Sequence, residues 1–180
     1  MKKIFTLFFG ILFALAIFTQ NAQALTFEGE NYNLIFATNK TPSGGWVNKF
    51  TRKGETARKW TKLINVHTFP MQKVAQGPTQ SMAKLLAGSG LMAQVTYDPQ
   101  NDIGMIDYII ANDDFVEFNI FKYEKNKQGE VVAMQFTFRT TAKEVRKNNN
   151  FADTVKQNRI KWLQEVRKTQ IPDVVKKEVQ

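Results

Sequence analysis

Two stretches in the C-terminal half of the chain alternate apolar and polar residues, and a glycine-containing turn joins them. The segment covers residues 115–141 and reads FVEFNIFKYEKNKQGEVVAMQFTFRTT. Alternation of this kind is typical of β-strands, because successive side chains point to opposite faces of a sheet. With Gly129 in the left-handed conformation, a three-residue loop connects the strands and Asn126 faces Glu130. The segment therefore predicts a β-hairpin of defined register.

This register divides the hairpin into one apolar face and one mixed face. The apolar face collects six side chains: Val116, Phe118, Ile120, Met134, Phe136 and Phe138. A slip of one residue would place apolar side chains opposite polar ones throughout, so the pairing is strongly specified. We therefore expect the apolar face to lie against the core.

The mixed face of the hairpin brings a carboxylate, amides, a guanidinium and an aromatic ring onto one surface. Five of its residues are candidates for contact with a ligand: Glu117, Asn119, Phe121, Gln135 and Arg139. The same register places Glu117 opposite Arg139, and an ion pair on a partly covered sheet is the simpler interpretation. Exposed pairs of this kind contribute at most about 1 kcal/mol to stability. The sequence leaves both interpretations open.

The rest of the chain predicts an α+β fold, in which helices cover an antiparallel sheet. Further strands are indicated at 32–38, with a short strand before it at 25–28 as an option, and at 46–52, 66–69, 93–97 and 105–111. Helices are indicated near 55–64, near 79–88 and, as a long C-terminal helix packed on one face of the sheet, from residue 143 onward.

Each helix prediction depends on apolar residues at helical spacing. Near 55–64 the series is Ala57, Trp60, Thr61 and Ile64. Near 79–88 it is Met82, Leu85 and Leu86, and we expect all three to point inward. In the C-terminal helix we expect a stripe of Phe151, Val155, Trp162 and Val166 to face the sheet. Pro172 ends this helix, and the last few residues are expected to form a tail.

The first residues read MKKIFTLFFGILFALAIFTQNAQA, with two lysines, an uncharged apolar run over 4–18 and a small-x-small end. This arrangement is typical of a cleavable signal peptide, here residues 1–24. A bilayer span takes about 20 apolar residues, so the run is short for a permanent anchor, although an uncleaved anchor remains an alternative. We expect a single α+β domain over 25–180, without a transmembrane segment, exported to the periplasm or the extracellular space.

The composition narrows the chemistry open to such a domain. The chain contains no cysteine and one histidine, which excludes disulfides, thiolate nucleophiles and metal sites built from several of these side chains. It contains no P-loop and no glycine-rich dinucleotide motif. We expect neither a metal nor a cofactor.

His67 is the one histidine, and we interpret it as a strand residue in the core or on the surface. As a general base it would need a nucleophile and an orienting partner, which the sequence does not supply. Ser89 lies between two glycines but lacks the spacing of a nucleophile elbow, and a helix C-cap is the better interpretation. We assign no catalytic residue, and a hydrolase using His67 or the Glu117 face is the second alternative function.

The formal net charge is +9, and the basic residues gather in two segments, 40–62 and 143–180. Five residues of the first segment are candidates for anion binding: Arg52, Lys53, Arg58, Lys59 and Lys62. A basic surface attracts anionic polymers or anionic membranes, which gives the first alternative function. A solvated, solubilising surface is the simpler interpretation. No nucleic-acid-binding module is recognisable, and we do not expect nucleic acid as a partner.

Three segments resemble a group of small exported bacterial proteins without an established activity. They are Lys53-Gly54-Glu55-Thr56 leading to Trp60-Thr61, residues 115–123 (FVEFNIFKY) and residues 132–139 (VAMQFTFR). The layout of strands, short helices and a final long helix is also similar to the PsbP-like α+β sandwich. The resemblance transfers no catalytic pattern, since a fold does not determine a function. Our main expectation is an exported, non-enzymatic binding or accessory protein whose ligand or partner is unknown.

Overall fold

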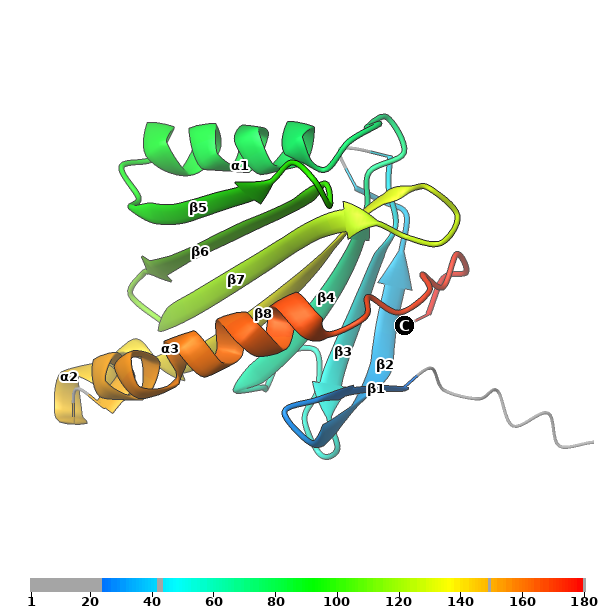
Figure 1. The fold of residues 1–180 in the computed structure, drawn as a ribbon. Coiled ribbons are helices and arrows are strands. Elements are labelled where there is room, and N and C mark those ends of the chain that lie inside the picture. Colours follow the sequence, from blue (N-terminus) through cyan, green and yellow to red (C-terminus); the bar gives the residue numbers. More distant parts are fainter. Residues whose placement is uncertain (1–23, 42–43, 149, 180) are drawn as a thin grey trace, which may run out of the picture.

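The structure is a computed structural model, and it describes residues 24–41, 44–148 and 150–179 (Figure 1). Apart from Ala24, the predicted signal peptide lies outside the described residues. An eight-stranded antiparallel sheet and three helices make up this part of the chain. The α+β class is therefore confirmed.

The strands follow the order β1-β2-β3-β4-β8-β7-β6-β5 across the sheet. Their bounds are β1 (Ala24–Phe27), β2 (Glu30–Thr38), β3 (Val47–Arg52), β4 (Lys62–Thr68), β5 (Ala93–Asp98), β6 (Ile103–Ala111), β7 (Phe115–Lys125) and β8 (Val131–Thr141). The helices are α1 (Gln76–Gly88), α2 (Ala142–Asn148) and α3 (Asn150–Lys168). Because β8 lies beside β4, the late hairpin meets a strand from the first half of the chain.

The predicted hairpin is confirmed as β7 and β8, in the predicted register. Phe118 lies opposite Phe138, and Glu117 lies opposite Arg139. Gly129 has a φ of +78°, a left-handed conformation that glycine adopts without a steric cost. The alternation of side chains therefore determined the pairing of these two strands correctly.

Helix α3 covers one face of the sheet, and the main core lies beneath it. The predicted stripe is buried: Phe151, Val155, Trp162 and Val166. The ring of Trp162 lies 6.0 Å from Phe118, 5.3 Å from Phe136 and 5.2 Å from Phe138, between ring centroids. These aromatic contacts attach the helix to the central strands β7 and β8.

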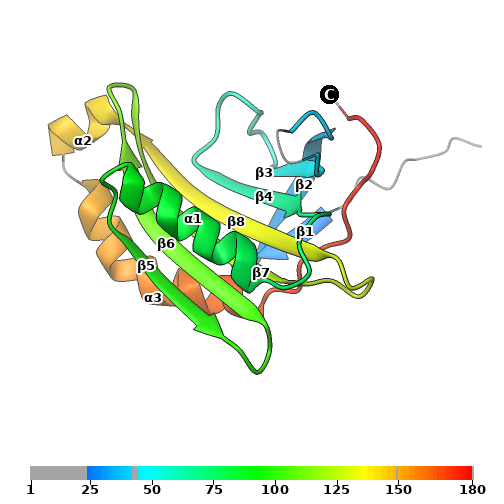
Figure 2. The ribbon, with the colours of Figure 1, turned by 90° about the horizontal axis from the view of Figure 1, so that it is seen from above.

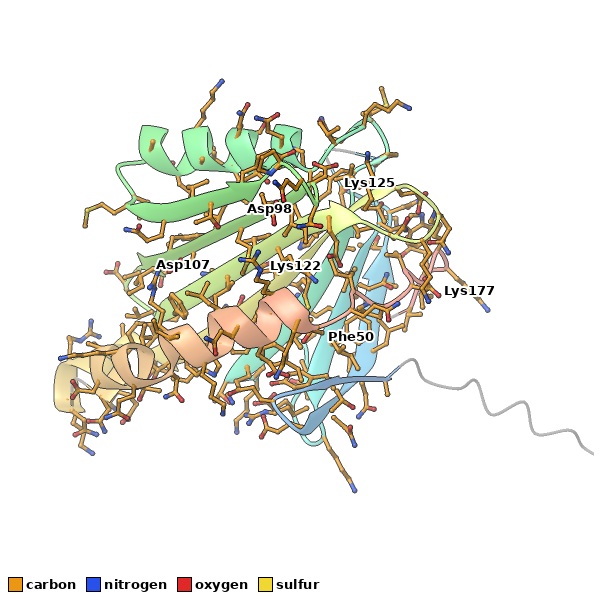
Figure 3. All side chains as sticks on the ribbon, in the orientation of Figure 1. Phe50, Asp98, Asp107, Lys122, Lys125 and Lys177 are labelled. Carbon is orange, nitrogen blue, oxygen red and sulfur yellow. The ribbon has the colours of Figure 1, made fainter. Side chains whose placement is uncertain are left out.

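A buried lysine of β7 ties the sheet to the C-terminal end of α3. Lys122 is 2% exposed, and its Nζ donates to the carbonyl of Thr169 at 2.6 Å and pairs with Glu124 at 3.0 Å. Figure 3 shows Lys122 between the strands and that helix end. An ammonium at this position satisfies carbonyl groups that have no partner within the helix and complements the negative end of its dipole.

After α3 the last described residues run as a tail that is hydrogen-bonded to the sheet. Val179 and Ala37 of β2 exchange two backbone hydrogen bonds of 2.9 and 3.0 Å. The side chain of Asn48, in β3, donates to the carbonyl of Val175 at 3.0 Å. The chain after α3 is therefore held along the strands at the β2 side of the sheet.

Helix α1 lies on the opposite face of the sheet from α3 (Figure 2). It forms a second, smaller apolar cluster with the strands: Ala75, Leu86, Ile106, Phe121, Tyr123 and Ala133. The helix predicted near 79–88 is confirmed and begins three residues earlier. Leu86 is buried as expected, but Leu85 is 64% exposed, so its expected inward position is wrong. The two side chains lie about 100° apart around the helix axis, and Leu86 is the one that packs on the strands.

The helix predicted near 55–64 is wrong. Residues 53–61 form a loop, and the following residues belong to β4. The Glu55 carboxylate holds the loop closed by accepting hydrogen bonds of 2.9 Å from the backbone and the hydroxyl of Thr61. Leu63 and Ile64 are both buried, on opposite faces of the sheet, which requires an extended strand. The apolar residues at helical spacing belong to two different elements, a loop and a strand.

Candidate ligand-binding site

The sheet face opposite α3 carries a row of polar side chains, which we call the polar strip. It crosses four strands and consists of Lys49 (β3), Asn65 (β4), Gln135 and Thr137 (β8) and Asn119 (β7). In the strand register Lys49 lies opposite Asn65, and Asn65 lies opposite Gln135. Residues directly opposite each other share one face, so these side chains are neighbours.

Hydrogen bonds between side chains fix the orientation of the strip. Asn65 Nδ2 donates to Gln135 Oε1 at 3.0 Å, and Gln135 Nε2 donates to Asn119 Oδ1 at 2.9 Å. The Thr137 hydroxyl donates to the same oxygen at 2.8 Å. Asn119 and Thr137 are each 1% exposed, so these bonds replace hydrogen bonds to water. Gln135 is half-buried, and Asn119 lies beneath it.

An aromatic clamp closes one end of this face. The Arg139 guanidinium carbon lies 3.8 Å from the ring centroid of Trp60 and 4.2 Å from that of Phe115. Its Nε donates to the Glu117 carboxylate at 2.7 Å. Both charged candidates from the sequence are thus engaged with each other, as the simpler interpretation expected. Trp60 packs on a cation, and this contact anchors the loop over residues 53–61.

A groove runs between α1 and the strands β4, β8 and β7, and we call it the α1 groove. Its floor consists of the rings of His67, Phe69, Phe121 and Tyr123, and its wall of Gln72, Pro78, Ser81, Met82 and Leu85. The cavity volume is about 350 Å³, at the lower end of the range for small-molecule sites. The Phe121 and Tyr123 rings are stacked with centroids 5.7 Å apart, and Phe69 is tilted by 55° against Tyr123.

His67 lies where the α1 groove meets the polar strip. Its Nε2 is 3.4 Å from Gln135 Oε1, and its ring centroid lies 6.1 Å from that of Phe121. Burial, opposed by the hydrogen bond to Gln135 and assisted by the charge of Lys49, lowers the pKa of His67 to about 4. Among the described residues Gln135 is its only hydrogen-bonding partner, so no nucleophile or orienting carboxylate completes a catalytic group.

Lys49 is the cation of the polar strip. Its Nζ lies 5.8 Å from the ring centroid of Phe36, and its charge helps to lower the pKa of His67. Burial, with a contribution from Arg139, lowers the pKa of Lys49. No carboxylate within the described ranges forms an ion pair with it. Asn65 Oδ1, beside it, is buried without a hydrogen-bond donor from the same residues.

The five anion-binding candidates divide into two groups. Arg52 pairs with Glu55 at 2.7 Å and Glu30 at 3.2 Å, and Lys62 pairs with Glu28 at 2.7 Å. Burial acts to raise the pKa of Glu55, but hydrogen bonds from Arg52 and Thr61 outweigh it and lower that pKa to about 2. Both of these cations are therefore engaged in ion pairs within the fold. The remaining three are exposed on the loop over 53–61: Lys53, Arg58 and Lys59.

Two further features bear on the kind of site. Over 24–41, 44–148 and 150–179, no three acidic, histidine or cysteine side chains gather as ligands for a metal ion. No helix within these ranges is long and apolar enough to cross a membrane.

Comparison with known proteins places the chain in a family. A family model matches residues 20–171, which is most of the chain. The chain belongs to this family. The family is uncharacterised, in agreement with the expected resemblance to proteins without an established activity. No curated protein and no solved structure matches the chain, and the likeness to the PsbP-like sandwich is not confirmed.

Sequence reasoning placed the mixed face of the hairpin correctly but missed its extension onto β3 and β4. Lys49, Asn65 and His67 belong to the same surface as Gln135. The signal that was available is the alternation in VNKFTR and KLINVHT, which puts Lys49 on one face of its strand and Asn65 and His67 together on one face of theirs. Only the position of β4 beside β8 shows that these faces coincide.

Proposed function

We propose that this protein is an exported, non-enzymatic binding protein that takes a small, largely apolar ligand into the α1 groove. The observation that carries the proposal is the aromatic floor of the groove, which lies open beside an exposed leucine of α1. Leu85 in the wall is 64% exposed, and the floor rings of His67 and Phe69 are half-buried, so a ligand in the groove would cover apolar surface. Burial of apolar area provides most of the affinity in sites of this kind.

Two observations support export. The family match begins at residue 20, after the apolar run over 4–18. The strand β1 begins at Ala24, and Leu25 is already 7% exposed within the fold. Cleavage after Ala24 would therefore remove the signal peptide and leave β1 with all but its first residue.

The groove is tested with N-phenyl-1-naphthylamine, a neutral apolar dye that fluoresces strongly when it is removed from water. We expect saturable binding to residues 25–180, and Leu85→Asp is expected to weaken it at least tenfold by placing a charge in the wall. Ile160→Asp is the matched control, because Ile160 is also 64% exposed on a helix, on the other face of the sheet. Dye binding that is absent, or equally weakened by both variants, would contradict the proposal.

Export is tested by expressing the full chain in a Gram-negative host and recovering the periplasmic and extracellular fractions. We expect a product whose N-terminal residue is Leu25, and Ala24→Arg should block cleavage because signal peptidases require small residues there. A cytoplasmic product that still carries residues 1–24 would refute export without affecting the groove.

A second candidate function is contact with an anionic polymer or membrane, supported by the position of two exposed basic segments. The loop over 53–61 and α2 lie at the same end of the sheet in both views (Figures 1 and 2), and Arg139 N donates to the carbonyl of Thr61 at 2.8 Å there. Helix α2 contributes Lys143, Arg146 and Lys147, all exposed. Retention on heparin that falls with added salt would support this second function. Retention that does not change with salt would count against it.

A further inference from the structure

We propose that the ligand of the α1 groove is an amphipathic anion, whose apolar part lies in the groove and whose anionic group lies on the polar strip beside Lys49. This inference rests on the proposed function, since it requires that the groove binds a ligand. It adds the chemical class of that ligand and the side chain that recognises it.

The groove and the polar strip form one continuous surface. Phe121, on the groove floor, lies directly opposite Gln135, which lies opposite Asn65, which lies opposite Lys49. Neighbouring strands are about 4.8 Å apart, so three steps of this kind carry the surface from the aromatic floor to the ammonium over about 14 Å. A ligand that fills the groove is therefore within reach of the strip through its polar end.

The charges on this part of the face favour an anion. Glu117 and Arg139 neutralise each other through their ion pair at the clamp. His67 is neutral at pH 7, because burial keeps the pKa of its ring at about 4. Lys49 therefore carries a positive charge that no carboxylate of the described residues balances. A cation brought onto the strip would be repelled by the ammonium, whereas a carboxylate, sulfate or phosphate would be attracted.

The surroundings of Lys49 also make an ionic contact there stronger than at the open surface. The ammonium is half-buried over the Phe36 ring, and no carboxylate in the described part of the chain pairs with it. Partly buried charges are screened less by salt and water than exposed ones. An anionic group next to Lys49 would supply the counter-ion that the described residues do not provide.

The amide groups of the strip lie beside Lys49 in fixed positions and add no charge. The amides of Asn65 and Gln135 are held in place by hydrogen bonds to each other and to Asn119. Since they are already positioned, a polar head group would not have to order them on binding.

The test compares three ten-carbon amphiphiles that differ in their head group, each displacing N-phenyl-1-naphthylamine below its micelle concentration. They are decanoate, 1-decanol and decyltrimethylammonium. We expect decanoate to bind at least tenfold more tightly than the other two at pH 7.5 and low salt. Shorter acids should bind less well, by about three- to fourfold for each methylene removed.

Variants of Lys49 identify the recognising group. Lys49→Gln is expected to weaken decanoate about tenfold and to leave 1-decanol unchanged, whereas Lys49→Arg should retain most of the preference for the anion. Lys84→Gln is the matched control, because Lys84 lies exposed on α1 and does not line the groove, and it should change neither affinity.

The outcomes separate this inference from the proposed function. If decanoate and 1-decanol bind equally to the unmodified protein, or if Lys49→Gln leaves the preference intact, the anion inference fails and the groove proposal stands. If neither these amphiphiles nor the dye binds, the proposed function fails and the inference fails with it. The head-group comparison uses the unmodified protein, so it remains decisive if a variant folds poorly.

Discussion

The two faces of the sheet are covered by one helix each, but the two helices cover them to different extents. Helix α3 buries its whole apolar stripe, and Trp162 is 2% exposed among the rings of β7 and β8. Helix α1 buries Leu86 but leaves Leu85 exposed and the floor rings of His67 and Phe69 half-buried. Around Trp162 the α3 face behaves as a core, with cavities of about 380 and 300 Å³ where α3 meets β5 and β6, whereas the α1 face combines a small core with a groove and a polar strip.

Within one sheet, the α3 face therefore contributes mainly to stability, and the α1 face offers the candidate binding surface. The packed aromatic contacts around Trp162 contribute to folding and leave no space for a ligand at that place. A half-covered face keeps apolar floor area, a charge and positioned amides available, at the expense of packing. The hairpin β7–β8 contributes to both faces, because alternate residues of the same strands point to opposite sides.

The largest expected effect concerns the α3 face. Trp162→Ala is expected to lower the free energy of unfolding by about 4 kcal/mol, because it removes the ring that joins α3 to the strands. Leu85→Ala on the α1 face is expected to change it by no more than about 0.5 kcal/mol. Urea denaturation at pH 7.5 measures both. Losses of similar size would show that the two faces do not differ in packing.

The next effect concerns pH. Below pH 6.5 the unfolded chain binds a proton at His67 that the folded chain does not bind until about pH 4. Stability present above pH 6.5 is therefore lost as the pH falls, by about 2.5 kcal/mol between pH 7 and pH 4.5. His67→Gln should remove most of this loss in urea denaturation at the two pH values. An unchanged pH profile in the variant would exclude His67 as its source.

A smaller effect is expected from the polar strip. Asn119→Ala leaves the Gln135 amide and the Thr137 hydroxyl without their shared acceptor, which should cost about 2 kcal/mol of stability. Asn148→Ala, an exposed residue at the end of α2, is the control and should be nearly neutral. If both variants are neutral, water replaces the amide and the strip is more open than the structure indicates.

The smallest effect has the opposite sign. Lys49→Met is expected to raise the free energy of unfolding by about 0.5–1 kcal/mol, because it replaces a half-buried ammonium that has no counter-ion in the described part of the chain. Thermal melting without ligand measures this change. A destabilised Lys49→Met protein would indicate that the ammonium stabilises the fold, and the contrast between a stable face and a binding face would weaken.

Local alternation explains why the hairpin was predicted correctly. It could not predict which other parts of the chain surround the residues of the hairpin. The face shared by Glu117, Asn119, Phe121, Gln135 and Arg139 follows from strand geometry alone. Their exposure does not: Asn119 and Phe121 are buried beneath neighbours that come from other strands and from α1. A pattern along one segment cannot show what another segment places over it.

The error over 55–64 has a related origin. The apolar spacing of Trp60 and Ile64 suits a helix, but Trp60 packs against Arg139 of β8 and Ile64 pairs between β3 and β8. Contacts with distant strands outweigh the local preference of a short segment, because a two-turn helix has little stability of its own.

By itself the sequence determined the register of the late hairpin, the buried stripe of the last long helix and the exclusion of cysteine chemistry, since these depend only on residue type and periodicity. The signal peptide remains a prediction. Only the tertiary structure decided that β4 lies beside β8, which brings Lys49 and Asn65 to Gln135, and that α1 covers half of that face. Strand order is set by contacts between residues far apart in the chain, and no local pattern records them.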